Sequence, residues 1–444
     1  MTDDDDEAPL RGIARGFRKR TLVTAKLGAR MGASFVKRTL IRPKEGDAPA
    51  EPIEDSEAVK NASELVKELG ALKGLVMKIG QIASYMPGAL PPEAQRVLTK
   101  LQANTTAMEY PQIEAVLVEQ LGHPPDELFE HFEPEPFAAA SIGQVHRARF
   151  EGRDVAVKIQ YPGIEDALRA DLKTATMMGR LGSLGTTIDG AGLVTELRDR
   201  VLEECDYRLE AKNQSSFSQL FESMPGARVP GVIPERSALR VLTSELDPGQ
   251  GFYPFCDEAS QEARDRAGEI IFRICFDCLF RHSIYNADPH PGNYLFSAEG
   301  EVTFLDFGCV RRFTPDMIEA WKLVARSVVA NDRARFRETF PALGMVGNPK
   351  KFDWDHQWTM MKYLYRPFLS TTPFTYTHDY VKESYGMMIF DNPNRRSGAM
   401  PPQWLFLNRL QWGLNSVLAH LRATAPWGDL WQAAIESPTV DPAF

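Results

Sequence analysis

Two carboxylates and one side-chain amide lie close together in the sequence between Ser283 and Val310, and they are the groups that phosphoryl transfer requires. They are Asp288, Asn293 and Asp306. Transfer of a phosphoryl group from a nucleotide needs one carboxylate beside the attacking group. It also needs a carboxylate and an amide oxygen on the metal ions that bridge the phosphates. We assign the first task to Asp288 and the second to Asn293 and Asp306, so the stretch predicts a nucleotide site that works with a metal ion.

The spacing of these residues matches the catalytic motifs of protein kinases. Asp288 and Asn293 keep the separation of the base and the metal-binding Asn of a kinase catalytic loop, and Asp306-Phe307-Gly308 corresponds to the metal-binding D-F-G. Either motif alone is weak, because A-D-P-H-P-G-N could be only a Pro/Gly turn. In this order, with the strand-like V-T-F-L-D before the second motif, they predict a kinase-type site. We expect His290 to orient the turn rather than to act as a second base or a metal ligand.

A lysine for the nucleotide phosphates is expected at Lys158, which ends the alternating strand D-V-A-V-K. In kinase-type sites a strand lysine neutralises the phosphates and is positioned by a helix carboxylate. Asp206 and Glu210 are one turn apart on a predicted helix and share a face. We predict Glu210 as the partner of Lys158, with Glu204 as the alternative. The other interpretation of this acidic cluster is a solvated helix face.

Two further segments are expected to contact the nucleotide through their backbones. The first is an alanine-rich loop upstream of Lys158, at a place where protein kinases have several glycines. Its backbone amides can still face phosphate oxygens, although alanine has less conformational freedom than glycine. This loop contains Ala138, Ala139, Ala140, Ser141 and Gly143. The second segment is the strand end at Glu245 and Leu246, where a hinge would present backbone groups to an adenine edge.

The segment after Gly308 is too short for a peptide-binding activation segment. The chain becomes helical almost at once in C-V-R-R-F-T-P-D-M-I-E-A-W, and no A-P-E follows. A protein substrate is therefore not expected. A small-molecule or lipid-like acceptor fits better, and ATP hydrolysis without an acceptor is a further alternative.

The hydrophobic periodicity predicts an α+β protein with a mainly helical second half. Helices are expected at Pro91–Gln102, Tyr110–Leu121, Gly163–Leu184 and Leu193–Phe221. Strands are expected from Phe132, on both sides of the turn Glu151–Arg153, and at Val232–Ile233, Leu239–Thr243, Asn293–Phe296 and Val302–Leu305. The 444 residues are divided into a tail and linker (1–56), a helical extension (57–130), a smaller lobe (131–246) and a larger lobe (247–444).

Composition and charge exclude several classes of protein. A hydrophobic content of 43%, a charged content of 25% and a net charge of −9 are those of a soluble globular protein and argue against a nucleic-acid binder. The five cysteines show no disulfide framework, which favours a reducing compartment, on the cytoplasmic or organelle-matrix side. Cys275 and Cys278 form a C-x-x-C, but it lies in an apolar helical run. We interpret both as core thiols rather than as a redox or metal pair.

The stretch from Leu10 to Lys44 carries only basic charges, with apolar residues between them near helical spacing. A basic amphipathic helix of this kind predicts peripheral contact with an anionic membrane. The alternatives are a solvated tail, a helix docked on the acidic body, and a transit peptide, which the leading Asp run disfavours. No run of about twenty apolar residues exists, since polar residues interrupt the nearest candidate, Trp404 to Leu421. We therefore expect no transmembrane segment.

Taken together, these motifs resemble the UbiB family of atypical kinases, also called the AarF or ADCK-type family. The resemblance covers most of the chain from Ala58 to about Leu421. It rests on K-I-G-Q at Lys78–Gln81, A-A-A-S at Ala138–Ser141, V-A-V-K ending at Lys158, E-C-D-Y-x-x-E-A from Glu204, A-D-P-H-P-G-N from Ala287 and D-F-G from Asp306. The pairing of K-x-G-Q with an alanine-rich loop is the specific part of this set.

The resemblance implies a bilobal protein-kinase-like fold that binds ATP with Mg²⁺. It also implies a helical extension in which Lys78, Gly80 and Gln81 fold over the active site, in the place of a peptide substrate, and contact Glu204 and Asp206. The implied biology is ATPase or small-molecule kinase activity at membranes in ubiquinone or other prenyl-lipid metabolism.

Two departures from the family pattern restrict what can be transferred. Some members have C-terminal transmembrane helices that this chain lacks, and Asn286 stands where some relatives have His. Two other functions remain open. One is a nucleotide-switched protein that binds or presents a prenyl lipid with little turnover. The other is an enzyme like the antibiotic or choline kinases, which would leave K-I-G-Q and the alanine-rich loop unexplained.

Overall fold

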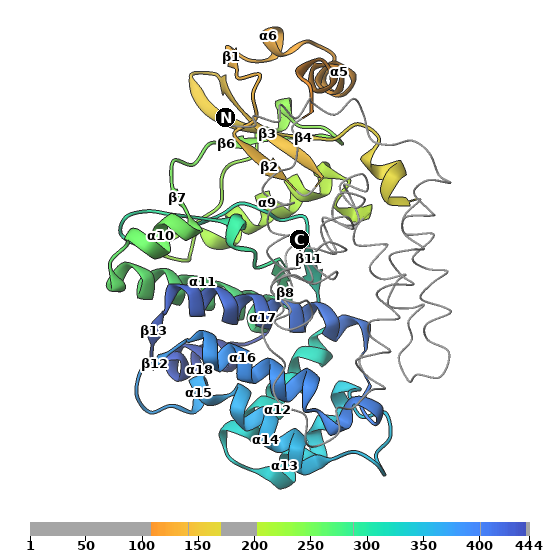
Figure 1. Cartoon of the computed structure of the whole chain (residues 1–444), viewed down its shortest axis with the longest axis vertical. Coiled ribbons are helices and arrows are strands. Elements are labelled where there is room, and N and C mark those ends of the chain that lie inside the picture. Colours follow the sequence, from red (N-terminus) through yellow and green to blue (C-terminus); the bar gives the residue numbers. More distant parts are fainter. Residues whose placement is uncertain (1–107, 141, 170–201, 287, 400, 441–444) are drawn as a thin grey trace, which may run out of the picture. The chain divides into compact units, whose positions relative to one another are not determined.

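The computed structural model describes residues 108–140, 142–169, 202–286, 288–399 and 401–440 (Figure 1). Contacts divide the chain into two compact units. The first comprises Met1–Leu184, Gly190–Cys205 and Ala238–Val241, and the second comprises Gly185–Asp189, Asp206–Ser237 and Leu242–Phe444. The predicted helices before residue 108, the K-I-G-Q motif and the basic N-terminal stretch lie outside the described residues.

The described part of the first unit is an antiparallel sheet with two helices. The elements are α5 (Tyr110–Leu121), α6 (Pro125–Leu128), β1 (His131–Phe132), β2 (Ala138–Ala140), β3 (Gly143–Phe150) and β4 (Arg153–Gln160). β3 pairs with β1, β2 and β4. The β3–β4 hairpin closes at Glu151 and Gly152, which both have positive φ. Val155, Val157 and Ile159 alternate along β4 and are fully buried, so one face of the hairpin forms the core.

Helix α5 has the bounds that its periodicity predicts. Pro111 lies in its first turn, and Gly122 ends it with φ +85° while its N–H bonds to the carbonyl of Val118. α5 packs against β4. The chain passes between the two units several times and enters the second unit for the last time within β6 (Val241–Glu245).

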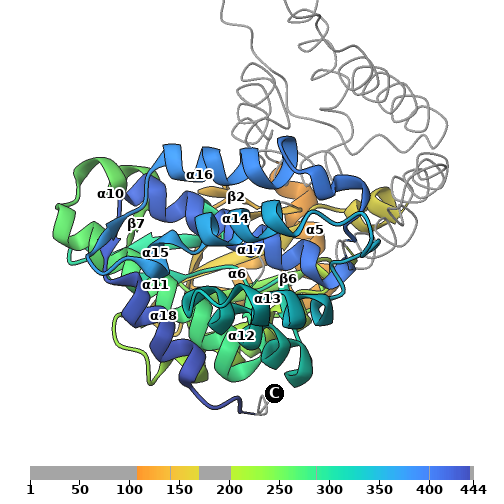
Figure 2. The same cartoon turned by 90° about the horizontal axis from the view of Figure 1, so that it is seen from below.

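The second unit contains two small sheets that carry the predicted catalytic motifs. It also contains a larger set of helices, which Figure 2 shows from below. One sheet has the order β5 (Ala227–Arg228), β10 (Val302–Phe304), β9 (Tyr294–Phe296) and β7 (Gln250–Gly251). The other pairs β8 (Ile284–Asn286) with β11 (Val310–Arg312). The helices are α9 (Tyr207–Phe221), α10 (Phe252–Glu258), α11 (Gln261–His282), α12 (Pro315–Val329), α13 (Arg333–Thr339), α14 (Trp354–Leu364), α15 (Arg366–Leu369), α16 (His378–Tyr385), α17 (Pro402–Leu421) and α18 (Trp427–Glu436).

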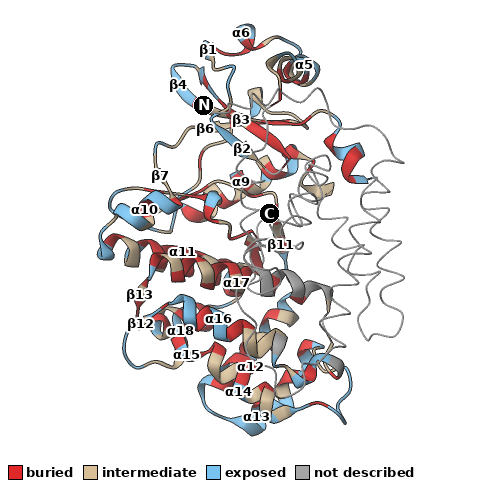
Figure 3. Cartoon of the chain, viewed as in Figure 1, coloured by how far each residue is buried: buried red, intermediate tan, exposed pale blue. Residues whose placement is uncertain are grey.

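Helix α11 forms the centre of this unit's core and is buried along much of its length (Figure 3). It packs against α17 and α18, and its aromatic side chains make close ring contacts. Phe272 lies 5.0 Å from Trp427, and Phe280 lies 5.2 Å from Trp321, between ring centroids. The helix begins where Ser260 accepts a hydrogen bond from the N–H of Ala263 and ends at Ser283. It therefore delivers the chain to β8 and to the predicted catalytic loop.

Several predicted elements differ from the structure. The helix expected over 193–221 is interrupted at Glu204 and Cys205, because Asp206 is extended and caps α9 instead of continuing a helix. Val232 makes only an isolated bridge to Ser244, before a 3₁₀ turn at Pro234–Arg236. β8 and β11 were not predicted. Other strand bounds differ by one or two residues, which is the ordinary uncertainty of such ends. Among the described residues, no helix is long and apolar enough to span a bilayer.

Candidate active site

The loop after β8 brings Asp288 and Asn293 together through hydrogen bonds. The Asn293 side-chain N–H donates to the Asp288 carbonyl over 2.9 Å. The His290 N–H donates to the same carbonyl over 2.8 Å, and the Asn293 N–H donates to the His290 carbonyl over 2.9 Å. Pro291–Asn293 forms a 3₁₀ turn at the entry to β9. This local network places the predicted base and one predicted metal ligand on one rigid turn, and the Asp288 side chain is largely buried (8% exposed).

The hydrogen bond of Asn293 also determines which end of its amide is available. Because the nitrogen donates to Asp288, the oxygen faces away from that contact. Within the described part of the chain, this Oδ1 accepts no hydrogen bond. Amide and carboxylate oxygens are the hard ligands that Mg²⁺ binds. This orientation leaves the Asn293 oxygen available, and its role as a metal ligand stays a prediction.

Asp306 follows β10 and is tied to the same loop. The Leu305 N–H donates to the Asn293 carbonyl over 3.0 Å, so β10 ends beside the turn. Asp306 Oδ1 accepts a hydrogen bond from the Gly308 N–H over 2.9 Å, which fixes the carboxylate within the D-F-G turn. Asp306 and Asn293 are therefore held by adjacent strands of one sheet.

Asn286 connects the two motifs, which the sequence did not reveal. Its Nδ2 donates to the Asp306 carbonyl, and its Oδ1 accepts from the Asp288 N–H over 3.3 Å. One amide side chain thus links the loop of Asp288 to the turn of Asp306. The available signal was a polar residue at the end of the apolar Ile284-Tyr285 pair.

His290 has the role predicted for a turn histidine. Its Nδ1 accepts a hydrogen bond from the Gly292 N–H over 2.8 Å. The neighbouring Tyr294 is buried, and burial is the main cause that raises the pKa of its hydroxyl well above the usual value, with the Cys275 and Asp288 charges adding to the effect. The Tyr294 hydroxyl therefore stays protonated and neutral.

Helix α9 supports the D-F-G turn from a second side. Phe307 is fully buried against Phe217, with ring centroids 5.0 Å apart. The Asn213 Nδ2 donates to the Phe307 carbonyl over 3.0 Å. Glu210, one turn earlier on α9, is 3% exposed. Sequence reasoning singled out Glu210 but missed Asn213, whose only signal was its position three residues further along the same helix.

In the first unit, the structure corrects the predicted alanine-rich loop. Ala138–Ala140 form strand β2, because Ala138 pairs with Val145 and Ala139 pairs with Gln144 of β3. Val145 also pairs with Lys158 on β4. Residues opposite one another on neighbouring strands project to the same face of the sheet. Ala138 and Lys158 therefore lie on the same face, about 10 Å apart, which is two strand spacings. Gly143 begins β3, and Ser141 lies outside the described residues.

Other predicted site residues are placed as follows. Glu245 ends β6, where its carboxylate accepts a hydrogen bond from the Gly231 N–H over 3.1 Å. The predicted contacts of Glu245 and Leu246 with a nucleotide stay predictions. The pairing of Lys158 with Glu210 also stays a prediction. Lys78, Gly80 and Gln81 lie outside the described residues, so their contact with Glu204 and Asp206 also stays a prediction.

Asp206 does have a structural task of its own. It accepts from the Arg208 N–H over 3.0 Å and pairs with the Arg208 guanidinium at 3.1 Å. These hydrogen bonds and the positive charge of Arg208 hold the pKa of the Asp206 carboxyl below its usual value. Asp206 is therefore a charged helix cap, not a member of a continuous helix face with Glu210.

The cysteine pair on α11 is structural, as predicted. Burial raises the pKa of the Cys275 thiol to about 12 and that of Cys278 well above its usual value. No group of three or more His, Cys, Asp or Glu side chains suited to a metal ion occurs among the described residues. A phosphate-bound Mg²⁺ does not require one, because it takes one or two protein oxygens together with phosphate oxygens and water.

Comparisons with known proteins show which family this chain resembles. Residues 100–340 match the family described as ABC1 atypical kinase-like domain. The chain is 34% identical over 283 residues to the mitochondrial atypical kinase COQ8B of Rattus norvegicus, covering 62% of this chain and 53% of that protein. It is 30% identical over 292 residues to the mitochondrial atypical kinase COQ8 of Saccharomyces cerevisiae, covering 64% and 58%. The chain thus spans a little over half the length of these two relatives.

A solved structure is similar over nearly its whole length. It is that of Rv3197 from Mycobacterium tuberculosis in complex with erythromycin, with 32% identity and a TM-score of 0.63, and the match covers 85% of this chain and 96% of the other. Together with the mixed helices and sheets described above, this similarity shows a kinase-like α+β fold.

Proposed function

The chain belongs to the family of ABC1 atypical kinase-like domains, and we propose that it binds ATP with Mg²⁺ and transfers or hydrolyses the terminal phosphate. The observation that carries this proposal is the hydrogen-bonded set of Asp288, Asn293 and Asp306, joined by Asn286. Two oxygen ligands and one further carboxylate on adjacent rigid turns are what positioning and charge neutralisation require in phosphoryl transfer.

Each residue of the proposed site has a distinct task. Asp306 and the Oδ1 of Asn293 would hold the metal ion, which when bound would neutralise charge on the phosphate oxygens. Asp288 would orient the attacking hydroxyl or water and accept its proton. Lys158 would hold the phosphates beside the Ala138–Ala140 strand, with Glu210 orienting the lysine. Glu245 and Leu246 would contact the base, and Lys78, Gly80 and Gln81 would cover the site together with Glu204 and Asp206.

We propose a small or lipid-like acceptor rather than a protein. Only β11 separates the D-F-G turn from α12, whose first turn is capped by the Thr314 hydroxyl. The described chain therefore has no activation segment on which a peptide would lie. The COQ8 relatives, together with the resemblance to the UbiB family, favour ubiquinone or another prenyl lipid. Their mitochondrial location and the basic stretch Leu10–Lys44 favour peripheral contact with an organelle membrane.

A second candidate is a nucleotide-controlled binding protein with little turnover. The observation that favours it is the similar solved structure, which is a complex with erythromycin, a large organic molecule that is not a nucleotide. In this case ATP and Mg²⁺ would bind at the same residues, and they would change the affinity for an apolar ligand instead of driving many cycles of hydrolysis.

The test is Mg²⁺-dependent ATP turnover with and without anionic liposomes, for the wild type, Asp306→Asn and Asp316→Asn. Asp316 is exposed in the first turn of α12, so it provides a matched control for the loss of one carboxylate. We expect turnover that rises on liposomes, disappears in Asp306→Asn and persists in Asp316→Asn. Tight nucleotide binding without turnover in the wild type would favour the second candidate. Absence of nucleotide binding would refute both.

A further inference from the structure

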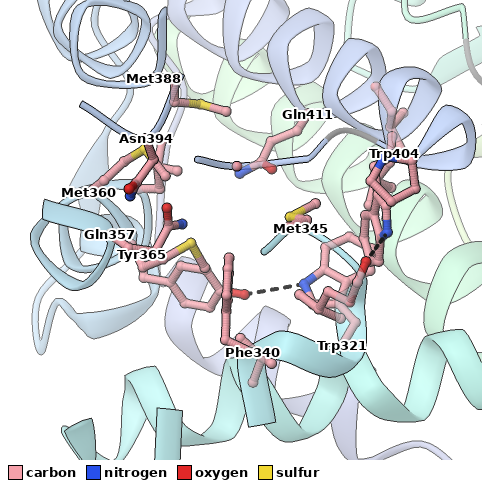
Figure 4. A pocket seen from close by; sticks show the side chains of 18 of the residues that line it. Trp321, Phe340, Met345, Gln357, Met360, Tyr365, Met388, Asn394, Trp404 and Gln411 are labelled. Carbon is pink, nitrogen blue, oxygen red and sulfur yellow. Dashed lines mark hydrogen bonds between the residues drawn. The ribbon is translucent and has the colours of Figure 1, made fainter. Parts of the chain in front are cut away.

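A cavity of about 480 Å³ lies inside the helical part of the second unit, apart from the Asp288 loop (Figure 4). Its lining comes from α11, α12, α14, α15, α17, α18 and the connections between the helices, and most of it is apolar. The main aromatic and sulfur-containing walls are Trp321, Phe340, Met345, Met360, Tyr365 and Trp404. The volume is within the range of small-molecule sites in proteins.

The aromatic walls are fixed by hydrogen bonds between residues of the lining itself. The Trp404 indole N–H donates to the Leu343 carbonyl over 2.8 Å, and the Trp321 indole N–H lies 3.4 Å from the Tyr365 hydroxyl. The polar atoms of both indoles are therefore turned to the protein, and their rings face the space. The pocket is partly open to solvent, so water can enter it. Because most of its walls are apolar, they hold water weakly and favour an apolar occupant.

One buried amide points into this space without a partner. Gln357 on α14 is only 6% exposed, and its side chain makes no hydrogen bond within the described part of the chain. The nearby Asn394, equally buried, is satisfied: it accepts from the Asp353 N–H over 2.7 Å and donates to the Asp353 carbonyl over 2.9 Å. The amide of Gln357 lines the pocket rather than being sealed in the core, so a polar atom of an occupant can pair with it there.

A second amide faces the same space from α17. Gln411 is half-buried, extends toward the opening in Figure 4, and has no hydrogen-bond partner among the described residues. Arg395 is the one charged residue in the described lining, and its side chain is exposed rather than enclosed. The enclosed surface is therefore neutral, with two amides as its unpaired hydrogen-bonding groups.

We propose that this cavity binds a neutral, mainly apolar molecule with a carbonyl or hydroxyl oxygen, which the amides of Gln357 and Gln411 hold. Access is through the half-exposed residues Asn392, Gly398, Ala399 and Pro401 on one side of the cavity. A charged ligand is disfavoured, because no enclosed charge would compensate its desolvation. The site does not involve Asp288, Asn293 or Asp306 and does not depend on the proposed ATP chemistry.

The first probe is Prodan, a neutral naphthalene with a ketone, whose emission shifts to shorter wavelength in apolar surroundings. We expect saturable binding of one Prodan per chain. Gln357→Leu keeps the side-chain shape but removes the amide, so Prodan affinity should fall about fivefold, the effect of one lost hydrogen bond. The same variant should bind dimethylnaphthylamine, which lacks the ketone, as well as the wild type does.

A second variant tests occupancy by blocking the space. Ala399→Trp places a large ring at the half-exposed side of the cavity and should abolish the binding of both probes. The matched controls are Gln432→Leu and Ala433→Trp, since both residues are exposed on α18 and neither lines the cavity. Neither control should change probe binding.

The thermal midpoint of the ligand-free variants checks folding. Gln357→Leu should be at least as stable as the wild type, because it removes an unpaired buried amide. A cavity that holds water only would give no saturable Prodan binding, and this result would overturn the proposal. Binding that is unchanged in both Gln357→Leu and Ala399→Trp would also overturn it. ATP turnover of the same samples tests the proposed active site separately.

Discussion

At the scale of single residues, Asn286 shows how one side chain can determine the geometry of a site without contacting a substrate. Its amide donates to the Asp306 carbonyl and accepts from the Asp288 N–H, so both motifs are positioned from one point. The two halves of an amide are required for this, because one contact needs a donor and the other needs an acceptor. Asn286 is therefore a positioning residue.

We predict that Asn286→Asp lowers the rate of ATP turnover by about 100-fold, the cost of a misplacement of roughly 1 Å. The carboxylate can still accept from the Asp288 N–H but cannot donate to the Asp306 carbonyl. Affinity for nucleotide should change much less, because Lys158, the residue proposed to hold the phosphates, is untouched. Asn286→His should retain more activity than Asn286→Asp, because an imidazole N–H can donate. Equal loss in both variants would contradict this role.

His146 gives a prediction about pH at the same scale. It is fully buried, with its Nδ1 2.8 Å from the Glu133 carbonyl and its Nε2 2.9 Å from the Gln144 amide. The Glu133 carbonyl can only accept, so Nδ1 donates to it. Nε2 then accepts from the Gln144 amide, and the ring is neutral. Burial is the main cause that lowers its pKa below the usual value, and the hydrogen bond to Glu133 only partly offsets this.

The direction of the pH effect follows from this lowered pKa. Below about pH 6.5 the unfolded chain takes up a proton at His146 that the folded protein does not take up. The free energy of unfolding therefore decreases as the pH is lowered, until the pH reaches the lower pKa of the folded protein. Between pH 7 and 5.5 the free energy of unfolding should therefore decrease. Hydrogen exchange of the β3–β4 amides, corrected for its intrinsic pH dependence, measures this decrease. His146→Gln should remove this part of the pH dependence, and an unchanged slope would contradict the assignment.

At the scale of elements, helix α17 supports the catalytic loop through a glycine. A β-carbon at Gly413 would overlap with the ring of Pro289, which directly follows Asp288. The absence of a side chain therefore lets the helix approach the loop closely. The same helix lines the cavity with Leu410, Gln411 and Leu414, so α17 lies between the catalytic loop and the proposed ligand site.

We predict that Gly413→Ala destabilises the protein and slows ATP turnover. Overpacking costs about 1–3 kcal/mol, which exceeds the gain of about 1 kcal/mol in helix propensity. The matched control is Gly386→Ala, whose added carbon would lie 3.6 Å from the Asp391 carboxylate, an ordinary contact. Denaturant unfolding and turnover measure both variants. If Gly413→Ala is as stable and as active as Gly386→Ala, the loop of Pro289 can move aside without cost, and the prediction is wrong.

The elements also show which parts of this fold a sequence can predict. α5 was predicted with its bounds because its signals are local: periodic apolar residues, Pro111 at its start and Gly122 after its end. The strands around Asn293 and Asp306 were predicted for the same reason. β8 and β11 have three residues each and become strands only by pairing with one another, across the 23 residues from 287 to 309 that separate them. The break at Asp206 was missed because a capping carboxylate and a helix-face carboxylate look alike until Arg208 is placed.

At the scale of the whole molecule, the C-terminal segment of the second unit returns to the helices that lead to the catalytic loop. The Val440 N–H donates to the Arg281 carbonyl over 2.6 Å, at the end of α11. Lys322 of α12 is 2% exposed, and its ammonium donates to the Ser437 carbonyl over 3.3 Å and to the Thr439 hydroxyl over 2.9 Å. Its remaining partner is Glu319, at 2.9 Å. A buried ammonium needs such partners, so the segment and Lys322 should stabilise one another.

This mutual dependence gives a prediction in the form of a double-mutant cycle. Removal of residues 437–444 should lower the free energy of unfolding by about 2 kcal/mol, because Lys322 loses two charge-assisted hydrogen bonds. In the Lys322→Met background the same deletion should cost about 1 kcal/mol less, since no buried charge is left unpaired. Lys382→Met, at an exposed position of α16, is the matched control and should leave the cost of deletion unchanged. All seven tryptophans belong to the second unit, so their fluorescence in denaturant reports its unfolding. If the costs of the deletion and of Lys322→Met are strictly additive, the segment stabilises the unit independently of Lys322.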